Sequence, residues 1–174
     1  MSLETQLAAV VARIRSQFNT VKGQINTPLF FAIGTSTADT DDTETDLTWT
    51  QVGGRVDSGY THSEGSASIR LDSPGWYKIE YAAGLNISTN ANRGELTLFL
   101  YQDTGSGFVQ IANSLSADYV VRDGNQNIGG TQGFFLLETT QDNVDIKVTA
   151  QTDTDGTLVA TLDPAQTRIL IEKK

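Results

Sequence analysis

The first 25 residues carry apolar side chains at helical spacing. Successive apolar positions lie 4, 3, 4, 4, 3 and 4 residues apart, which places them on one face of an α-helix and does not suit a strand, whose side chains alternate between two faces. We expect Ser2 to cap the helix and Asn26-Thr27-Pro28 to end it, because a proline drives the preceding residue out of the helical region. The seven apolar positions are Leu3, Leu7, Val10, Ile14, Phe18, Val21 and Ile25.

The same spacing predicts what this helix packs against. A 4-3-4 interval repeated twice is an 11-residue repeat of about 3.67 residues per turn, which is typical of a straight or slightly right-handed bundle. The stripe is narrow, and a long helix ahead of a β-domain commonly bundles with copies of itself or docks on a platform. We therefore expect an anchor or a bundle, with packing on its own domain as the alternative.

After Pro28 the pattern changes to strand-like alternation. Short apolar runs alternate with turn signals such as Gly53-Gly54, Ser73-Pro74-Gly75 and Asp123-Gly124-Asn125, a spacing typical of a β-sandwich or barrel. No further helix is expected. The predicted strands are 29–34, 47–52, 66–71, 76–85, 94–102, 107–112, 117–122, 131–138, 143–150, 157–162 and 167–172.

Two of these strands are apolar on both faces. Strand 143–149 is the contrasting case: its apolar residues face one way and Asp145 and Lys147 face the other, as in a sheet with one face exposed to solvent. In 96–101, by contrast, the leucines share one face while Phe99 and Tyr101 occupy the other, and residues 76–81 show a weaker version of this pattern. Only one face can line the sandwich core, so we expect another subunit to cover the second face.

Several motifs resemble C1q- and TNF-like domains. The segment Ser73-Pro74-Gly75-Trp76-Tyr77-Lys78-Ile79-Glu80-Tyr81 is similar to the Pro-Gly-x-Tyr-x-(Phe/Ile) strand of that family. Gly130, Gly133, Leu137, Asp142, Val144 and Ile146 resemble its later strands, and Arg168-Ile169-Leu170-Ile171-Glu172 resembles its closing central strand. The chain departs from the animal members in this closing strand and at Gln141, where a glycine is usual. With its N-terminal helix it is more similar to the versions found in bacteriophage virion proteins.

The resemblance implies a mainly β fold, a jelly-roll β-sandwich of the C1q/TNF-like type over residues 28–174, preceded by an amphipathic helix in residues 1–27. It also implies a trimer around a three-fold axis and a role in display or binding, not catalysis. The seven apolar helix residues would then form the trimer interface of the stem. The expected interface residues of the head are Tyr77, Tyr81, Leu98, Phe99 and Tyr101.

Composition and charge disfavour some classes of binding partner. The 174 residues carry a net charge of −9 and no cysteine, which disfavours a nucleic-acid partner, disulfides and thiol chemistry. There is no apolar run of membrane-spanning length and no signal-peptide pattern, so we expect no membrane partner and synthesis in a host cytoplasm.

Candidate chemistry is sparse, and we expect no enzymatic activity and no cofactor. The lone histidine, His62, lies in a polar run that suggests a solvated loop, and the long repeats of a fibre glycosidase are absent. The acidic run 39–46 and Asp153-Thr154-Asp155-Gly156 are expected to be a solvated loop and a hairpin turn, although Ca²⁺ binding by the acidic run is conceivable.

These features predict a trimeric structural protein on the surface of a phage particle, most simply a capsid decoration or head-fibre protein. Its partners would be its own copies and phage capsid or tail proteins. The alternative is the receptor-binding tip of a tail fibre, with a bacterial surface glycan or protein as its target and specificity in loops 36–46, 86–93 and 122–131.

Overall fold

The structure, a computed structural model, describes residues 3–25, 29–37, 43–55, 59–87, 93–123, 126–154 and 160–174. The predicted cap at Ser2 and the predicted helix stop at Asn26-Thr27-Pro28 lie outside these residues. Among the described residues, no helix is long and apolar enough to cross a membrane.

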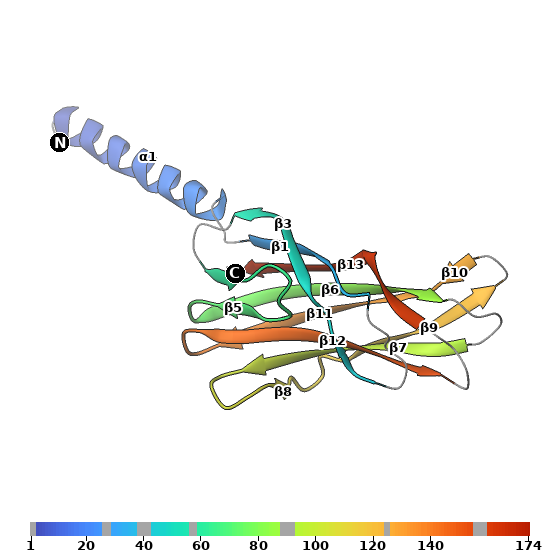
Figure 1. The fold of residues 1–174 in the computed structure, drawn as a ribbon. Helices are drawn as coiled ribbons and strands as arrows, with labels where there is room; N and C mark the ends of the chain where they lie inside the picture. Colours follow the sequence, from blue (N-terminus) through green and yellow to red (C-terminus); the bar gives the residue numbers. More distant parts are fainter. Residues whose placement is uncertain are drawn as a thin grey trace.

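The predicted N-terminal helix is confirmed. Helix α1 (Leu3–Ile25) leaves the sandwich at the end where the first strand begins (Figure 1). All side chains from Thr5 to Phe18 are exposed, so packing of this part of the helix on its own domain is not observed.

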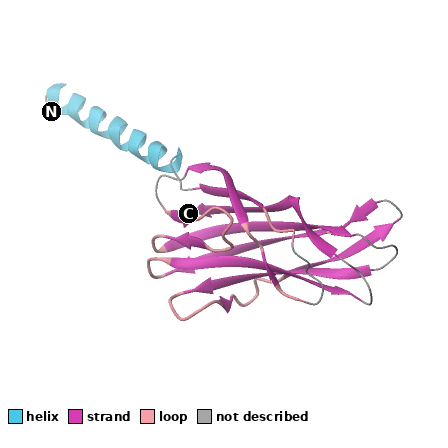
Figure 2. Cartoon of the chain, viewed as in Figure 1, coloured by secondary structure: helices cyan, strands magenta, loops and turns pink. Residues whose placement is uncertain are grey.

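The rest of the described chain is built from strands and their connections (Figure 2). The predicted strand 29–34 matches β1, and most of the other predicted strands are found with shifted ends. The strands are β1 (Leu29–Gly34), β2 (Thr45–Asp46), β3 (Trp49–Arg55), β4 (Tyr60–His62), β5 (Ile69–Leu71), β6 (Gly75–Ile87), β7 (Arg93–Asp103), β8 (Val109–Gln110), β9 (Ser116–Asp123), β10 (Gln126–Ile128), β11 (Gly130–Thr139), β12 (Val144–Thr154) and β13 (Ala160–Lys173).

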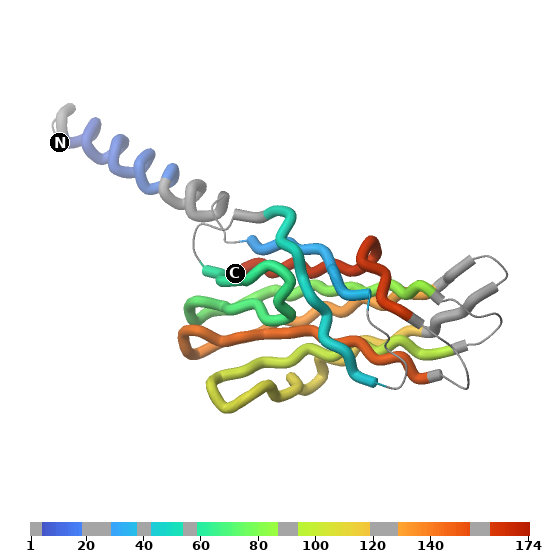
Figure 3. Tube along the Cα trace, in the orientation of Figure 1, coloured from blue at the N-terminus to red at the C-terminus, as the bar shows by residue number. Residues whose placement is uncertain are grey.

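These strands form two antiparallel sheets that pack as a sandwich. The five-stranded sheet has the order β11-β6-β13-β1-β3, and the larger sheet has the order β10-β9-β7-β12-β5-β4, with β2 beside β12 and β8 beside β7. Strand β13 is therefore central, between β6 and β1. The C-terminus lies near the end from which α1 departs (Figure 3), and strands β6, β9 and β12 run towards the opposite end (Figure 1).

The core confirms the alternation expected in the central strands. The inner side of the larger sheet is lined by Leu96, Leu98 and Leu100 of β7 and by Val144, Ile146 and Val148 of the neighbouring β12, and all six side chains are buried. Each apolar face thus loses its contact with water against the opposite sheet, which is the main driving force for this architecture.

Two details differ from the sequence prediction. Segments 157–162 and 167–172 were expected as separate strands, but the described residues join in one strand, β13, interrupted by a register shift between Asp163 and Arg168. Strands β2, β4 and β10 were not predicted, since two or three residues are too few to show an alternation.

Candidate self-association surface

The outer face of the five-stranded sheet is apolar across four strands. Backbone pairing places Phe134 of β11 beside Glu80 of β6, Glu80 beside Leu170 of β13, and Leu170 beside Phe31 of β1. These residues share a face because paired residues of antiparallel strands point the same way. We call this surface the apolar sheet face; its apolar members are Phe31, Ile33, Trp76, Phe134, Leu136 and Leu170.

Much of this face is in contact with solvent. Phe134 is 61% exposed, and Trp76, Leu136 and Ile33 are also exposed, whereas Phe31 and Leu170 are half-buried. A groove of about 460 Å³ runs between Phe31, Leu170 and Phe134. An apolar surface of this extent on one chain indicates a binding surface.

The charged residues on this face are largely paired locally. The Lys78 ammonium lies 2.5 Å from a Glu80 carboxylate oxygen and 5.7 Å from the centre of the Phe134 ring, and Lys174 lies 2.7 Å from Glu172. The hydrogen bond with Glu80 raises the pKa of Lys78. A second chain would therefore meet side chains of balanced charge between the apolar residues.

Three of the five predicted head-interface residues lie elsewhere, which corrects the sequence expectation. Tyr77, Tyr81 and Leu98 are buried in the core of a single chain, so a second copy cannot reach them. The Tyr77 hydroxyl donates to the Ser73 carbonyl at 2.5 Å, and the Tyr81 hydroxyl donates to the carbonyl of Ser114. Burial raises the pKa of Tyr81 to about 12.

The error at Tyr77 and Tyr81 concerns the face of the strand, not the strand itself. Alternation separates two sets of residues in β6 but does not say which set faces the other sheet. The structure turns the tyrosines inward and Trp76, on the opposite set, outward.

Phe99 and Tyr101 do lie on the outer face of the larger sheet, and the chain itself partly covers them. Both are half-buried. The Lys147 ammonium lies 5.5 Å from the centre of the Tyr101 ring and 4.9 Å from that of Phe108. Desolvation, helped by a hydrogen bond with Glu44, raises the pKa of Tyr101 to about 12. Segments near β2 and β8 thus provide part of the cover that was expected from another subunit.

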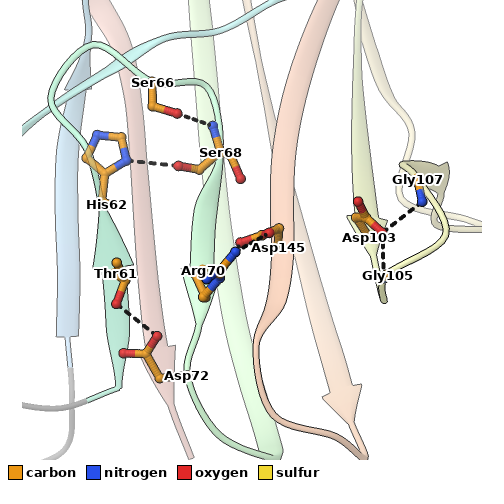
Figure 4. A network of polar contacts seen from close by, with 10 residues as sticks. All are labelled: Thr61, His62, Ser66, Ser68, Arg70, Asp72, Asp103, Gly105, Gly107 and Asp145. Atoms are coloured by element: carbon orange, nitrogen blue, oxygen red, sulfur yellow. Dashed lines mark hydrogen bonds and ion pairs between the residues drawn. The ribbon is translucent and has the colours of Figure 1, made fainter.

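His62 is not the solvated loop residue that was expected. It ends β4 and is half-buried, with its ring edge against Phe30. Its Nδ1 lies 3.0 Å from the Ser68 carbonyl oxygen (Figure 4), and its Nε2 lies 3.1 Å from the Trp49 carbonyl oxygen. Both ring nitrogens therefore face main-chain acceptors, an arrangement that ties β4 to neighbouring segments.

The ion pair nearest this region also has a structural role. Arg70 of β5 donates through Nε and Nη2 to the two carboxylate oxygens of Asp145 of β12, at 3.0 and 2.9 Å (Figure 4). The hydrogen bonding with Asp145 raises the pKa of Arg70.

Asp103 closes the turn before β8. Its carboxylate accepts hydrogen bonds from the backbone N–H groups of Gly105 and Gly107, and these hydrogen bonds lower the pKa of Asp103.

Part of the acidic run is used to attach β2 to the larger sheet. Asp46 pairs with Lys147 at 2.7 Å, and Glu44 accepts a hydrogen bond from the hydroxyl of Thr149. The end of the run therefore forms strand β2 and has Lys147 as a basic partner, where the sequence suggested a solvated loop. Residues 39–42 and 155–156 lie outside the described residues, and among those described no three His, Asp or Glu side chains are grouped as metal ligands.

The helix surface remains uncovered where its side chains are described. Leu7, Val10, Ile14 and Phe18 are 47–72% exposed, and the neighbouring Val11 is exposed as well. The side chains of Leu3, Val21 and Ile25 lie outside the described part of the chain.

Sequence reasoning missed Phe31, Phe134 and Leu170, although a usable signal was present. The runs LFFAIG (29–34) and GFFLLE (133–138) are apolar on both faces, which is the pattern that was read as a subunit contact in 96–101. Their convergence on one face follows from the strand order, which the alternation does not reveal.

Comparison with known proteins identifies the fold. No protein-family model and no curated protein matches the chain. Among solved structures, murine APRIL at pH 8.0 aligns with a TM-score of 0.58 and 12% identity, covering 85% of this chain and 99% of that chain. Eiger TNF from S. frugiperda aligns with a TM-score of 0.51 and 12% identity, covering 86% and 93%. The chain thus has a TNF-like jelly-roll fold, which confirms the fold class expected from the sequence.

Proposed function

We propose that this protein is a non-enzymatic homotrimer that displays its jelly-roll head on a larger particle, and that the apolar sheet face is the contact between its heads. The apolar sheet face, on which Phe134, Leu136, Trp76 and Ile33 are exposed, is the observation that carries the proposal. A second copy is its simplest occupant, because the sequence resembles a family that trimerises and the charges on this face are balanced rather than of one sign.

The exposed apolar side chains supply part of the area that a stable contact needs. A specific interface buries roughly 1,200–2,000 Å² in total, and a fully exposed aromatic side chain can bury about 150–250 Å². Phe134 and Trp76 are 61% and 45% exposed and contribute the largest part of the apolar area, with Leu136 adding to it. Each square ångström of apolar area removed from water contributes about 25 cal/mol.

The oligomeric state tests this contact. Light scattering coupled to size exclusion should give three times the 18.8 kDa of one chain. F134D would place a carboxylate in a desolvated contact, which is costly, and should shift the protein towards monomer with an unchanged circular dichroism spectrum. V109D is the matched control, because Val109 is exposed to a similar extent (65% against 61%) but lies on the other sheet. A native monomer, or equal dissociation of both variants, would refute the proposed contact.

The setting we propose is the outer surface of a phage virion, as a capsid decoration or head-fibre protein. Helix α1 leaves one end of the sandwich, and strands β6, β9 and β12 end at the other (Figure 1), which suits attachment at one end and display at the other. The acidic head would also resist nonspecific adhesion. Electron cryomicroscopy of intact virions would test this location: many copies at three-fold positions of the shell support it, and absence from the shell contradicts it.

The alternative is a receptor-binding tip of a tail fibre. It is favoured by the polar sequence of the connection between β6 and β7, which contains Ser88-Thr89-Asn90-Ala91-Asn92 and begins at the end of the head remote from the helix. Saturable binding of the purified protein to host cells, lost on replacing this connection by glycine and serine, would support the tail-fibre role over capsid decoration.

A further inference from the structure

From Thr5 to Phe18, helix α1 buries no side chain, so this described part lacks the packed face that normally stabilises a helix of this composition. All described side chains from Thr5 to Phe18 are exposed. The helix is about 34 Å long and is rich in β-branched residues, which are weak helix formers. In water most helical stability comes from packing an apolar face and not from intrinsic propensity, so a partner for this helix is expected.

The connection to the head restricts where that partner can be. Only residues 26–28 separate Ile25 from Leu29, and this distance is at most about 14 Å along an extended chain. Leu29 opens β1, and it lies on the same side of the sheet as Phe31, two residues further on. The C-terminal end of each helix is therefore held close to the apolar sheet face, and heads that meet through this face bring their helix ends together.

The residue pattern matches a helix of the same kind in the same register. The apolar arc formed by Leu7, Val10, Val11, Ile14 and Phe18 covers about 100° of the helix at 100° per residue. Arg15 lies at the border of this arc and Ser16 lies opposite it. In a parallel arrangement without stagger, identical apolar residues meet at every level along the 11-residue repeat, whereas an axial stagger would set unlike levels of the repeat against one another.

We propose that α1 forms a parallel, in-register three-helix stem with the helices of two other copies, which continues the axis of the trimeric head. The inference rests on the proposed trimer and adds its stem. It places Leu7, Ile14 and Phe18 in the interior of the stem and keeps Arg13 and Ser16 at its surface.

Single cysteines introduced into this cysteine-free chain test the stem. In the full-length protein, L7C, I14C and F18C should each form disulfide-linked pairs of chains under mild oxidation, with yields at least fivefold above that of the matched control S16C. Linkage at both Leu7 and Phe18 requires parallel helices in register, since an antiparallel pair that brings one of these residues to its copy separates the other from its copy by about 33 Å along the axis.

The mass of the same variants separates the two proposals. A trimer by light scattering, with linkage at the three apolar positions and not at Ser16, supports the stem. A trimer in which I14C links no better than S16C overturns the stem and leaves the head contact intact, whereas a monomer overturns both. A fluorophore on F18C that shifts to shorter wavelength when vesicles of phosphatidylglycerol and phosphatidylcholine are added would also overturn the stem, because it would place this residue on a lipid surface.

Discussion

The contact between Gly133 and Tyr81 offers a sharp test of how the edge strand β11 is held. Gly133 faces inward and is paired with Tyr81 across β11 and β6. A Cβ atom at position 133 would overlap the tyrosine ring and lie 2.6 Å from its hydroxyl oxygen. Because Tyr81 is only 2% exposed, its ring has little space into which it could move. G133A should therefore disturb the packing between the two strands.

The cost follows from two contributions. Adding a methyl group to a packed core costs about 1–3 kcal/mol. Displacing the Tyr81 hydroxyl would leave the buried carbonyl of Ser114 without this donor, at a further cost of about 1–3 kcal/mol. Together these two contributions are expected to lower the free energy of unfolding of G133A by about 2–6 kcal/mol. The effect should also reach the apolar sheet face, because β11 carries Phe134 on its outer side.

Urea unfolding followed by circular dichroism measures this change. Chain concentration must be held constant, because the stability of an oligomer depends on it. G53A in β3 is the matched control: a Cβ atom there would lie 3.8 Å from the Phe31 ring, an ordinary contact, so a change below about 1 kcal/mol is expected. The double variant G133A/Y81L should recover part of the loss. If G133A were as stable as G53A, the proposed overlap with Tyr81 would be incorrect.

Three further predictions concern the core. L98D should unfold the chain instead of dissociating native subunits, since Leu98 is fully buried; a folded monomer by circular dichroism and light scattering would contradict its position. Tyr81 has a pKa of about 12 in the folded protein and about 10 in an unfolded chain. This difference corresponds to about 2–3 kcal/mol of the free energy of unfolding, which is fully present below pH 10 and is lost as the pH rises through 12. Urea titrations at alkaline pH should show a smaller loss in the free energy of unfolding for Y81F than for the unchanged protein. Equal losses would refute the assignment of this loss to Tyr81. H62A removes the contacts with Ser68 and Trp49 and should cost about 1–3 kcal/mol in thermal unfolding, whereas an unchanged melting temperature would show that these contacts are not stabilising.

The sequence allowed the element types to be predicted but not the surface they form. The helical spacing in residues 3–25 and the alternation in residues 143–150 each depend on local periodicity, and both elements were correctly assigned. The apolar sheet face joins residues such as Phe31, Glu80, Phe134 and Leu170 that are far apart in the sequence, and their alignment depends on the pairing of β1, β6, β11 and β13. Periodicity within one strand contains no information about such long-range register.

The central position of β13 has a consequence for synthesis of the protein on the ribosome. Strand β1 pairs with β13, and so does β6 on its other side, so the five-stranded sheet cannot close until the residues after 160 have emerged. Until then the strands that carry Phe30 and Ile79, which are buried in the folded chain, lack β13 on one side and are open to aggregation. Loop closure over this separation also makes folding slow. Nascent chains interrupted before residue 160 should therefore be substrates for chaperones and proteases, whereas completed chains can close the sheet and then assemble.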